Sequence, residues 1–208
     1  LNFIEGGVVT MSESFVSIRD RIISTAIEII SESGLNSLST RTLAMRENTS
    51  EAMIYKCFGG INEVIIEVIE YFAKFDKTIM ATVAGKRGST IEKILFFFET
   101  YATYYESYPE ITAIVLNYEG LLHNTDTRET ITACIVERAK FLYVLLDEGI
   151  SNGEIIDIYT SQELSMMLMG IFERCLLDRR VVYHQRGFKQ EIMETMRKLL
   201  KSLDGRDI

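Results

Sequence analysis

Residues 38–58 read LSTRTLAMRENTSEAMIYKCF and contain two short segments with helical spacing, separated by Asn48 and Thr49. Ser39 or Thr40 can cap the first segment and Ser50 the second, because a hydroxyl there accepts a hydrogen bond from a free first-turn amide. Asn tolerates the positive φ that a tight turn between helices requires. Four apolar residues are spaced to pack the segments together: Leu43, Ala44, Ile54 and Phe58. The stretch predicts a helix-turn-helix, whose second helix can enter the major groove of DNA.

The composition around this stretch is that of an all-α protein. One proline and 13 glycines in 208 residues are too few turn signals for a β-sandwich or barrel. Hydrophobic residues make up 47% and charged residues 25%, which excludes disordered and collagen-like chains. Helical periodicity, glycines and capping signals predict nine helices, over residues 16–33, 40–47, 51–57, 62–83, 89–106, 109–119, 127–148, 161–184 and 188–203.

Capping boxes mark four of the expected helix starts. In such a box a side chain before the helix and a carboxylate three residues later bond each other's backbone amides. The four pairs are Ser89/Glu92, Ser107/Glu110, Asp126/Glu129 and Thr160/Glu163. The pattern predicts a helix-turn-helix domain over residues 12–60 and a larger helical domain over residues 61–208. Residues 1–11 are expected to be a tag remnant or an upstream extension.

Charge and cysteine content bound the cellular setting. The net charge of −8 argues against nonspecific coating of nucleic acid or anionic membrane, although a local binding face remains compatible with it. The three cysteines form no CxxC pair, which favours a reducing compartment, and we expect the cytoplasm. The longest apolar runs are too short to cross a bilayer, and the N-terminus lacks the basic region of a signal peptide, so no membrane partner is expected.

Residues 21–64 resemble the DNA-binding domain of the TetR family of bacterial repressors. The shared pattern is an Ile-Ile-x-x-Ala first helix, Gly34-Leu35, Leu38-Ser39-Thr40-Arg41-x-Leu43-Ala44, Ser50-Glu51-Ala52-x-Ile54-Tyr55-x-x-Phe58 and Glu63-Val64. The remainder of the chain matches the family in the number and order of its helices. The resemblance implies a homodimeric regulator that binds a double-stranded DNA operator and is released by a small effector.

The resemblance also implies roles for individual side chains on the two helices of the helix-turn-helix. Arg41 resembles a base-reading arginine that pairs with guanine, with a surface ion pair to Glu47 or Glu51 as the alternative. Thr40 and Tyr55 resemble phosphate-contacting hydroxyls, and the alternative for Tyr55 is a core tyrosine with a solvated tip. The remaining candidates for base or phosphate contacts are Glu51, Ala52, Met53 and Lys56, and Glu51 is alternatively a favourable first-turn carboxylate.

Three positions depart from the family pattern. Asn48 replaces the usual turn glycine, and Cys57 replaces a polar residue. Ile61 lies where the family has a phosphate-binding lysine, at the start of the fourth helix. Backbone amides near Gly60 or the side chain of Asn62 are expected to take over that contact.

Aromatic residues crowd the segment 89–108, which is apolar around most of its circumference and predicts a central helix of the larger domain. Together with neighbouring helices these side chains can line an apolar pocket for a small hydrophobic or aromatic effector. The alternative for each aromatic is ordinary core packing. The candidate effector-binding residues are Phe72, Phe75, Phe97, Tyr101, Tyr104, Tyr105, Tyr118 and His123.

The last two expected helices carry long apolar stripes that predict a four-helix interface between two chains. Gly170 permits close approach at a crossing. The alternative is that both stripes are consumed inside one chain. The candidate interface residues are Leu168, Ile171, Cys175, Leu176, Ile192, Met196 and Leu199.

Motifs for chemistry are absent from the sequence. His123 and His184 have no HExxH or ExxH partner, so no metal site is expected. GxGxxG, P-loop and GxSxG motifs are also missing, and no cofactor or catalytic residue is expected. The sequence therefore favours a ligand-responsive repressor over a helical enzyme. The alternative is a helical ligand-binding or scaffold protein that has lost DNA binding, which the missing lysine and the negative charge favour.

Overall fold

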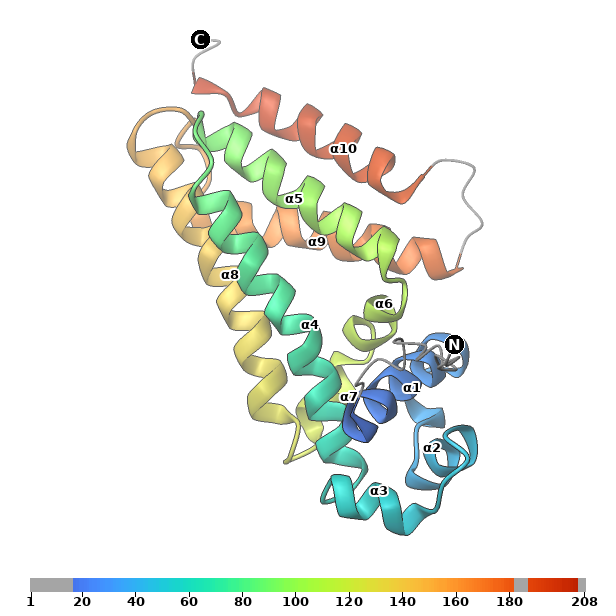
Figure 1. Cartoon of the computed structure of the whole chain (residues 1–208). Helices are drawn as coiled ribbons and strands as arrows, with labels where there is room; N and C mark the ends of the chain where they lie inside the picture. Colours follow the sequence, from blue (N-terminus) through green and yellow to red (C-terminus); the bar gives the residue numbers. More distant parts are fainter. Residues whose placement is uncertain (1–16, 182–186, 206–208) are drawn as a thin grey trace, which may run out of the picture.

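The structure, a computed structural model, describes residues 17–181 and 187–205 (Figure 1). Regular structure in these residues is helical, apart from an isolated antiparallel bridge between Ile155 and Asp204. None of the described helices is long and apolar enough to span a membrane. The elements are α1 (Ile18–Ser33), a 3-10 turn (Leu35–Ser37), α2 (Thr40–Arg46), α3 (Glu51–Cys57), α4 (Ile61–Ala84), α5 (Thr90–Ser107), α6 (Glu110–Val115), α7 (Tyr118–His123), α8 (Arg128–Ser151), α9 (Ser161–Val181) and α10 (Phe188–Ser202).

Helices α1 to α3 form a small group at one end of the molecule (Figure 1). The Ser39 hydroxyl accepts a hydrogen bond from the Thr42 amide, and the Ser50 hydroxyl accepts one from the Met53 amide, as expected. Asn48 has a φ of 50°, so the turn between α2 and α3 has the predicted left-handed residue. The helix-turn-helix is therefore confirmed, with Leu43 and Ile54 fully buried between its helices.

Arg19 fastens this small group to the start of α4. Its guanidinium lies over the Phe58 ring, 4.2 Å from the ring centre, and donates to the Cys57 carbonyl. The same group donates to Glu63 at 3.1 Å and to Glu67 at 2.6 Å. Because one side chain bonds the end of α3 and two turns of α4, the small group and α4 are connected by more than the intervening chain.

Helix α4 runs diagonally from the small group into the larger body (Figure 1). There α5 packs against α4, α8 and α10, while α9 packs against α8 and α10. At the lower end, α1 packs against both α4 and α6. The body is thus connected to the helix-turn-helix through two of its own helices.

Two of the four expected capping boxes form. Ser89 and Glu92 bond each other's amides, and so do Thr160 and Glu163. The other two predictions are wrong, because the side chains bind elsewhere. The Ser107 hydroxyl donates to the Thr103 carbonyl within α5. The Asp126 carboxylate accepts from Asn62 of α4, and α8 begins without a side-chain cap.

Two predicted helix boundaries also differ from the structure. The helix expected over residues 109–119 is divided into α6 and α7, and the Asn117 side-chain amide donates to the Ala113 carbonyl at this break. Gly149 does not end α8, which continues to Ser151. A Cβ at Gly149 would lie 2.7 Å from the Ile155 side chain and 2.9 Å from that of Thr90. Glycine is therefore required here for a close approach rather than for a turn.

The predicted dimer stripe is largely consumed inside the single chain. Four of its residues belong to the core and have at most 1% exposure, so the interface prediction is wrong for Leu168, Leu176, Ile192 and Met196. The other three, Ile171, Cys175 and Leu199, are partly buried against the same core. Apolar periodicity shows that a helix face is covered, but not whether the cover is another chain. The outward face of α9 instead exposes Met166, Leu177 and Val181.

Replacing Leu168 by alanine tests this placement. Because its side chain is fully buried within the chain, the substitution should lower the free energy of unfolding by about 2–5 kcal/mol. Gln162→Ala, at an exposed position of the same helix, should change it by less than about 0.5 kcal/mol. Urea denaturation at several protein concentrations measures both. A Leu168→Ala protein with wild-type stability at high dilution would contradict burial within one chain.

Candidate DNA-binding face and effector cavity

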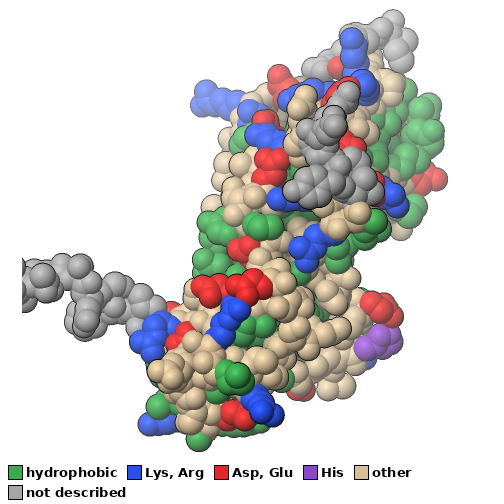
Figure 2. Space-filling model, turned by 90° about the vertical axis from the view of Figure 1, so that its right-hand side faces the viewer, with side chains coloured by type: hydrophobic (Ala, Val, Ile, Leu, Met, Phe, Trp, Pro, Cys, Tyr) green, Lys and Arg blue, Asp and Glu red, His purple; other side chains and the backbone are tan. Residues whose placement is uncertain are grey.

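Helices α2 and α3 lie at the end of the molecule farthest from α10 (Figure 1). Basic, acidic and hydrophobic side chains are mixed on this end (Figure 2). Tyr55 is 57% exposed, so it is not a core tyrosine. The predicted DNA contacts fall into two groups, with Arg41, Glu51, Ala52, Tyr55 and Lys56 exposed and with Thr40 and Met53 partly buried.

Arg41 does not form the surface ion pair that was its alternative role. Glu47 accepts from the Thr25 hydroxyl at 2.5 Å and pairs with Arg21 at 3.4 Å. Glu51 accepts from the Thr40 hydroxyl at 2.7 Å. Both carboxylates are therefore engaged by other side chains, and the Arg41 guanidinium is left on the surface.

Some basic residues of the small group form ion pairs with carboxylates, and others do not. Arg19 pairs with Glu63 and Glu67, Arg21 with Glu47, and Arg46 with Glu28 and Glu32. Within the described part of the chain, Arg41 and Lys56 take part in no ion pair. The two cations that can meet a nucleic acid without breaking an internal contact are thus the two on the reading helices.

The start of α4 differs from the expected phosphate contact. The Asn62 side-chain amide donates to Asp126 at 2.7 Å, and its oxygen accepts from Asn124 at 3.1 Å. Asn62 therefore binds the loop before α8, and the expectation that it replaces the family lysine is wrong in this conformation. Glu63 lies beside it and accepts from the Gly59 amide at 2.6 Å. That hydrogen bond, with a further contribution from Arg19, lowers the pKa of Glu63 below its ordinary value.

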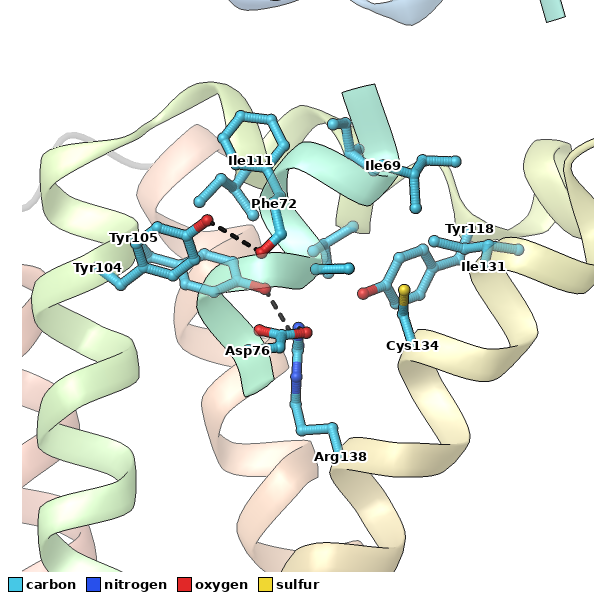
Figure 3. Close-up of a pocket in the computed structure, with 13 residues that line it drawn as sticks. Ile69, Phe72, Asp76, Tyr104, Tyr105, Ile111, Tyr118, Ile131, Cys134 and Arg138 are labelled. Atoms are coloured by element: carbon cyan, nitrogen blue, oxygen red, sulfur yellow. Dashed lines mark hydrogen bonds and ion pairs between the residues drawn. The ribbon is translucent and has the colours of Figure 1, made fainter. Parts of the chain in front are cut away.

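A small cavity lies inside the larger body, between α4, α5, α6, α7 and α8 (Figure 3). Its volume is about 30 Å³, which is room for about one water molecule. Ligand sites for drug-sized molecules are on the order of 300–1,000 Å³, so the body must open to admit one. The walls are apolar, and five polar side chains face the space: Asp76, Tyr104, Tyr105, Tyr118 and Arg138.

Seven of the eight predicted effector-binding residues separate into three groups. Phe72, Tyr104, Tyr105 and Tyr118 line the cavity. Phe97 and Tyr101 are packed in the core, with ring centres 4.7 Å apart. Phe75 lies beside the cavity, with its ring tilted against that of Tyr104 and the ring centres 5.1 Å apart.

The prediction for His123 is wrong. Its side chain is 77% exposed at the end of α7, where Nε2 lies 2.9 Å from the Glu119 carboxylate (Figure 2). His184 lies outside the described residues. The described residues contain no cluster of three or more potential metal ligands.

A buried ion pair crosses the cavity wall, and the sequence interpretation missed it. The Arg138 Nη2 atom of α8 lies 2.7 Å from the Asp76 Oδ2 atom of α4, and the two side chains are only 11% and 9% exposed. The Arg138 Nη1 atom donates to the Tyr105 hydroxyl at 3.2 Å, and the guanidinium lies 4.8 Å from the centre of the Tyr101 ring. The available signal was a charged residue inside an apolar helical stripe, as Asp76 is between Phe72 and Ile79.

Burial sets the protonation states around this pair. Loss of water raises the pKa of Tyr101, Tyr104, Tyr105 and Tyr118 above the ordinary tyrosine value, so their hydroxyls stay protonated. Burial opposes the charge on Arg138, but neighbouring Tyr105, Tyr118 and Asp76 outweigh it and raise its pKa well above the ordinary value. The cavity therefore contains a permanent cation, its counter-ion and several neutral hydrogen-bond donors.

No protein-family profile matches the sequence. A curated relative, the "Probable HTH-type transcriptional regulator YttP" of Bacillus subtilis, is 22% identical over 147 residues, which cover 69% of this chain and 70% of the relative. A TetR-family regulator from Agrobacterium tumefaciens superposes with a TM-score of 0.73 at 15% identity, covering 89% of this chain and 97% of that one. The chain has the fold of the TetR-family transcriptional regulators.

Two further TetR-fold structures contain ligands. FadR from B. subtilis, in complex with stearoyl-CoA, superposes with a TM-score of 0.70 at 18% identity, covering 85% of this chain and 96% of that one. A protein from Saccharomonospora viridis, in complex with choline, gives 0.76 at 14%, covering 88% and 95%. One ligand is a long acyl thioester and the other a small cation, so the fold does not specify the ligand.

The buried ion pair gives a direct test of the cavity geometry. Arg138→Met leaves Asp76 charged and unpaired, so it should lower the free energy of unfolding by about 3–5 kcal/mol. The double variant Arg138→Met with Asp76→Asn removes both charges and should recover most of that loss. Chemical denaturation of the wild type, both single variants and the double variant measures the coupling. Additive losses in the double variant would show that the two side chains do not pair.

Proposed function

We propose that the protein is a ligand-responsive transcriptional repressor, which binds a pseudo-palindromic DNA operator as a homodimer and is released by a small hydrophobic effector. In this proposal residues 12–60 form the DNA-binding domain and residues 61–208 the effector-binding and dimerisation domain. The observation that carries it is the course of α4. Its first turns bind Arg19 of α1, and its middle lines the cavity through Phe72 and Asp76.

This arrangement supports a mechanical connection between effector and operator. The cavity is too small for an effector in this conformation, so binding must separate the helices around it. Two of those helices, α4 and α6, are the ones that pack on α1. A displacement of either helix changes the position of the helix-turn-helix. In a dimer it also changes the distance between the DNA-binding domains of the two chains.

Dimerisation follows from the charge of the reading face. Arg41 and Lys56 are too few cations for one DNA-binding domain to bind an operator tightly. In a dimer, once one domain has bound, binding of the second domain is intramolecular, which raises the overall affinity. The proposed interface is the outward face of α9, where Met166, Leu177 and Val181 are exposed. Gly170 lies on the same helix with open space around its Cα, which permits close approach of a second helix.

Selection of bound fragments from the source genome tests the function. A regulator should enrich a small set of fragments that share an inverted repeat, with half-sites about 34 Å or a multiple of it apart. Affinity should fall with rising salt concentration, and with a shallow slope because few cations reach phosphate. Failure to enrich any fragment favours the alternative of a helical ligand-binding protein without DNA binding. Ile61 and the acidic Glu63 at the start of α4 support that alternative.

Arg41 and Tyr55 should contribute to operator binding in different ways. If Arg41 pairs with a guanine, Arg41→Ala should cost about 1–3 kcal/mol and relax base preference at one operator position. Tyr55→Phe removes a phosphate contact and should weaken all sequences about equally. Binding titrations against single-base operator variants separate the two effects. An unchanged base preference in Arg41→Ala would remove this residue from sequence readout.

A charge on the outward face of α9 should break the dimer. Leu177→Glu places a carboxylate, twice by symmetry, in the proposed apolar interface, so sedimentation should show folded monomers with weakened operator binding. Ala81→Glu adds the same charge to an exposed site of α4, a helix that does not pack on α9, and should leave the dimer intact. A stable Leu177→Glu dimer would place the interface elsewhere.

A further inference from the structure

We propose that the effector is a carboxylate with an apolar body, and that its carboxylate binds Arg138 in place of Asp76. The inference rests on the proposed function, because it specifies the ligand of the same cavity. It is carried by the hydrogen-bonding state of the buried cluster around Arg138.

Donors outnumber acceptors in this cluster. A guanidinium has five N–H groups, and Arg138 donates to Asp76 and to the Tyr105 hydroxyl. Its Nε atom is buried and has no hydrogen-bond partner, and the hydroxyl of Tyr101, a residue that is 1% exposed, has none either. Unpaired buried donors are costly and uncommon, and an additional acceptor beside Arg138 satisfies its Nε atom.

Arg138 lines empty space on two sides. One side is the cavity of about 30 Å³ next to α4 and α6, and the other is a cavity of about 20 Å³ next to α9. Tyr105, Val115 and Tyr118 border both cavities. The Tyr118 hydroxyl points into the space in front of Arg138 (Figure 3). The head group of a ligand that fills both cavities therefore meets a protein cation, Arg138, and neutral hydrogen-bond donors.

The rest of the cavity wall specifies an apolar body. Ile69, Ile111, Ile114 and Ile131 contribute aliphatic side chains. Burial raises the pKa of Cys134, so its thiol is neutral and adds no charge to the wall. The cavity next to α4 thus offers no second partner for a charge far from Arg138, whereas the wall of the cavity next to α9 also contains Glu173, a carboxylate of an exposed residue that does not bind an anion.

A cationic ligand fits this site less well than an anionic one. Arg138 already occupies the position next to Asp76 and over the Tyr101 ring where a ligand ammonium would be stabilised. An ammonium would leave two cations around one carboxylate. A ligand carboxylate instead has the same planar acceptor geometry as the Asp76 side chain and exchanges with it on the same guanidinium.

The exchange connects binding to α4. One guanidinium cannot fully neutralise two buried carboxylates, so binding of the ligand separates Asp76 from Arg138. Asp76 is part of α4, which Arg19 fastens to the helix-turn-helix. Recognition of the head group and displacement of the reading head are then the same event.

Titration calorimetry on the full chain without DNA tests the proposal. The probes are decanoate and phenylbutyrate as carboxylates, with decanol and decyltrimethylammonium as neutral and cationic analogues. Wild-type protein should bind at least one carboxylate about tenfold more tightly than decanol or the ammonium.

Three variants assign that preference to the ion pair. Asp76→Asn removes the competing carboxylate and should strengthen carboxylate binding by about tenfold. The double variant Arg138→Met with Asp76→Asn should fold and bind decanol but lose the preference. The control Lys93→Met with Glu148→Gln removes an ion pair between α5 and α8, on neither side of the cavity, and should behave as wild type.

The proposal is overturned if neither carboxylate binds, if decanol or the ammonium binds as tightly, or if the double variant keeps its preference for carboxylates. A protein that is released from DNA by decanol but not by decanoate would keep its proposed function and lose this inference. A protein that binds decanoate through Arg138 but selects no DNA would keep this inference and lose the proposed function.

Discussion

The ion pair between Asp76 and Arg138 is the constraint on which the larger body depends. Two charges that are about one-tenth exposed must keep each other as partners, since neither can be left alone without a large loss of stability. The pair fixes α4 against α8 and orders the tyrosines around it. It also makes the closed cavity a defined state rather than loose packing, because an opening that separates the helices needs a replacement for one of the charges.

Helix α4 carries this constraint to the other end of the molecule. Arg19 bonds its first turns to α1 and to the end of α3, while Asn62 bonds its start to the loop before α8. The helix is thus held by polar contacts at its start and by the buried pair in its middle. A displacement of α4 at Asp76 therefore acts on a helix whose first turns are bonded to the helix-turn-helix. Local chemistry in the cavity and the orientation of α2 and α3 are in this way parts of one mechanical unit.

The helix-turn-helix was predictable because its signals are local. Ser39, Asn48 and Ser50 act on amides or dihedral angles within a few residues, and in this stretch no distant contact takes these side chains away from the turn. The cavity was predictable only in part, because aromatic periodicity identifies a covered face but not an empty space. Leu168 and Leu176 show the same limit, since a stripe does not reveal which chain covers it. Ser107 and Asp126 failed as caps because tertiary partners or the preceding turn took their side chains.

In the proposed repressor, the distribution of cations explains how a small displacement controls DNA binding. Most of the arginines in the small group are held by internal carboxylates, and Arg41 and Lys56 are the ones left on the reading helices. A face with so few free cations gains little from sequence-independent attraction to phosphate, especially in a chain of net charge −8. In the proposed dimer, affinity then depends on both DNA-binding domains meeting their half-sites together. Because that requirement is geometric, a shift of α4 that spoils the spacing removes most of the binding, without any change in the charges that face the DNA.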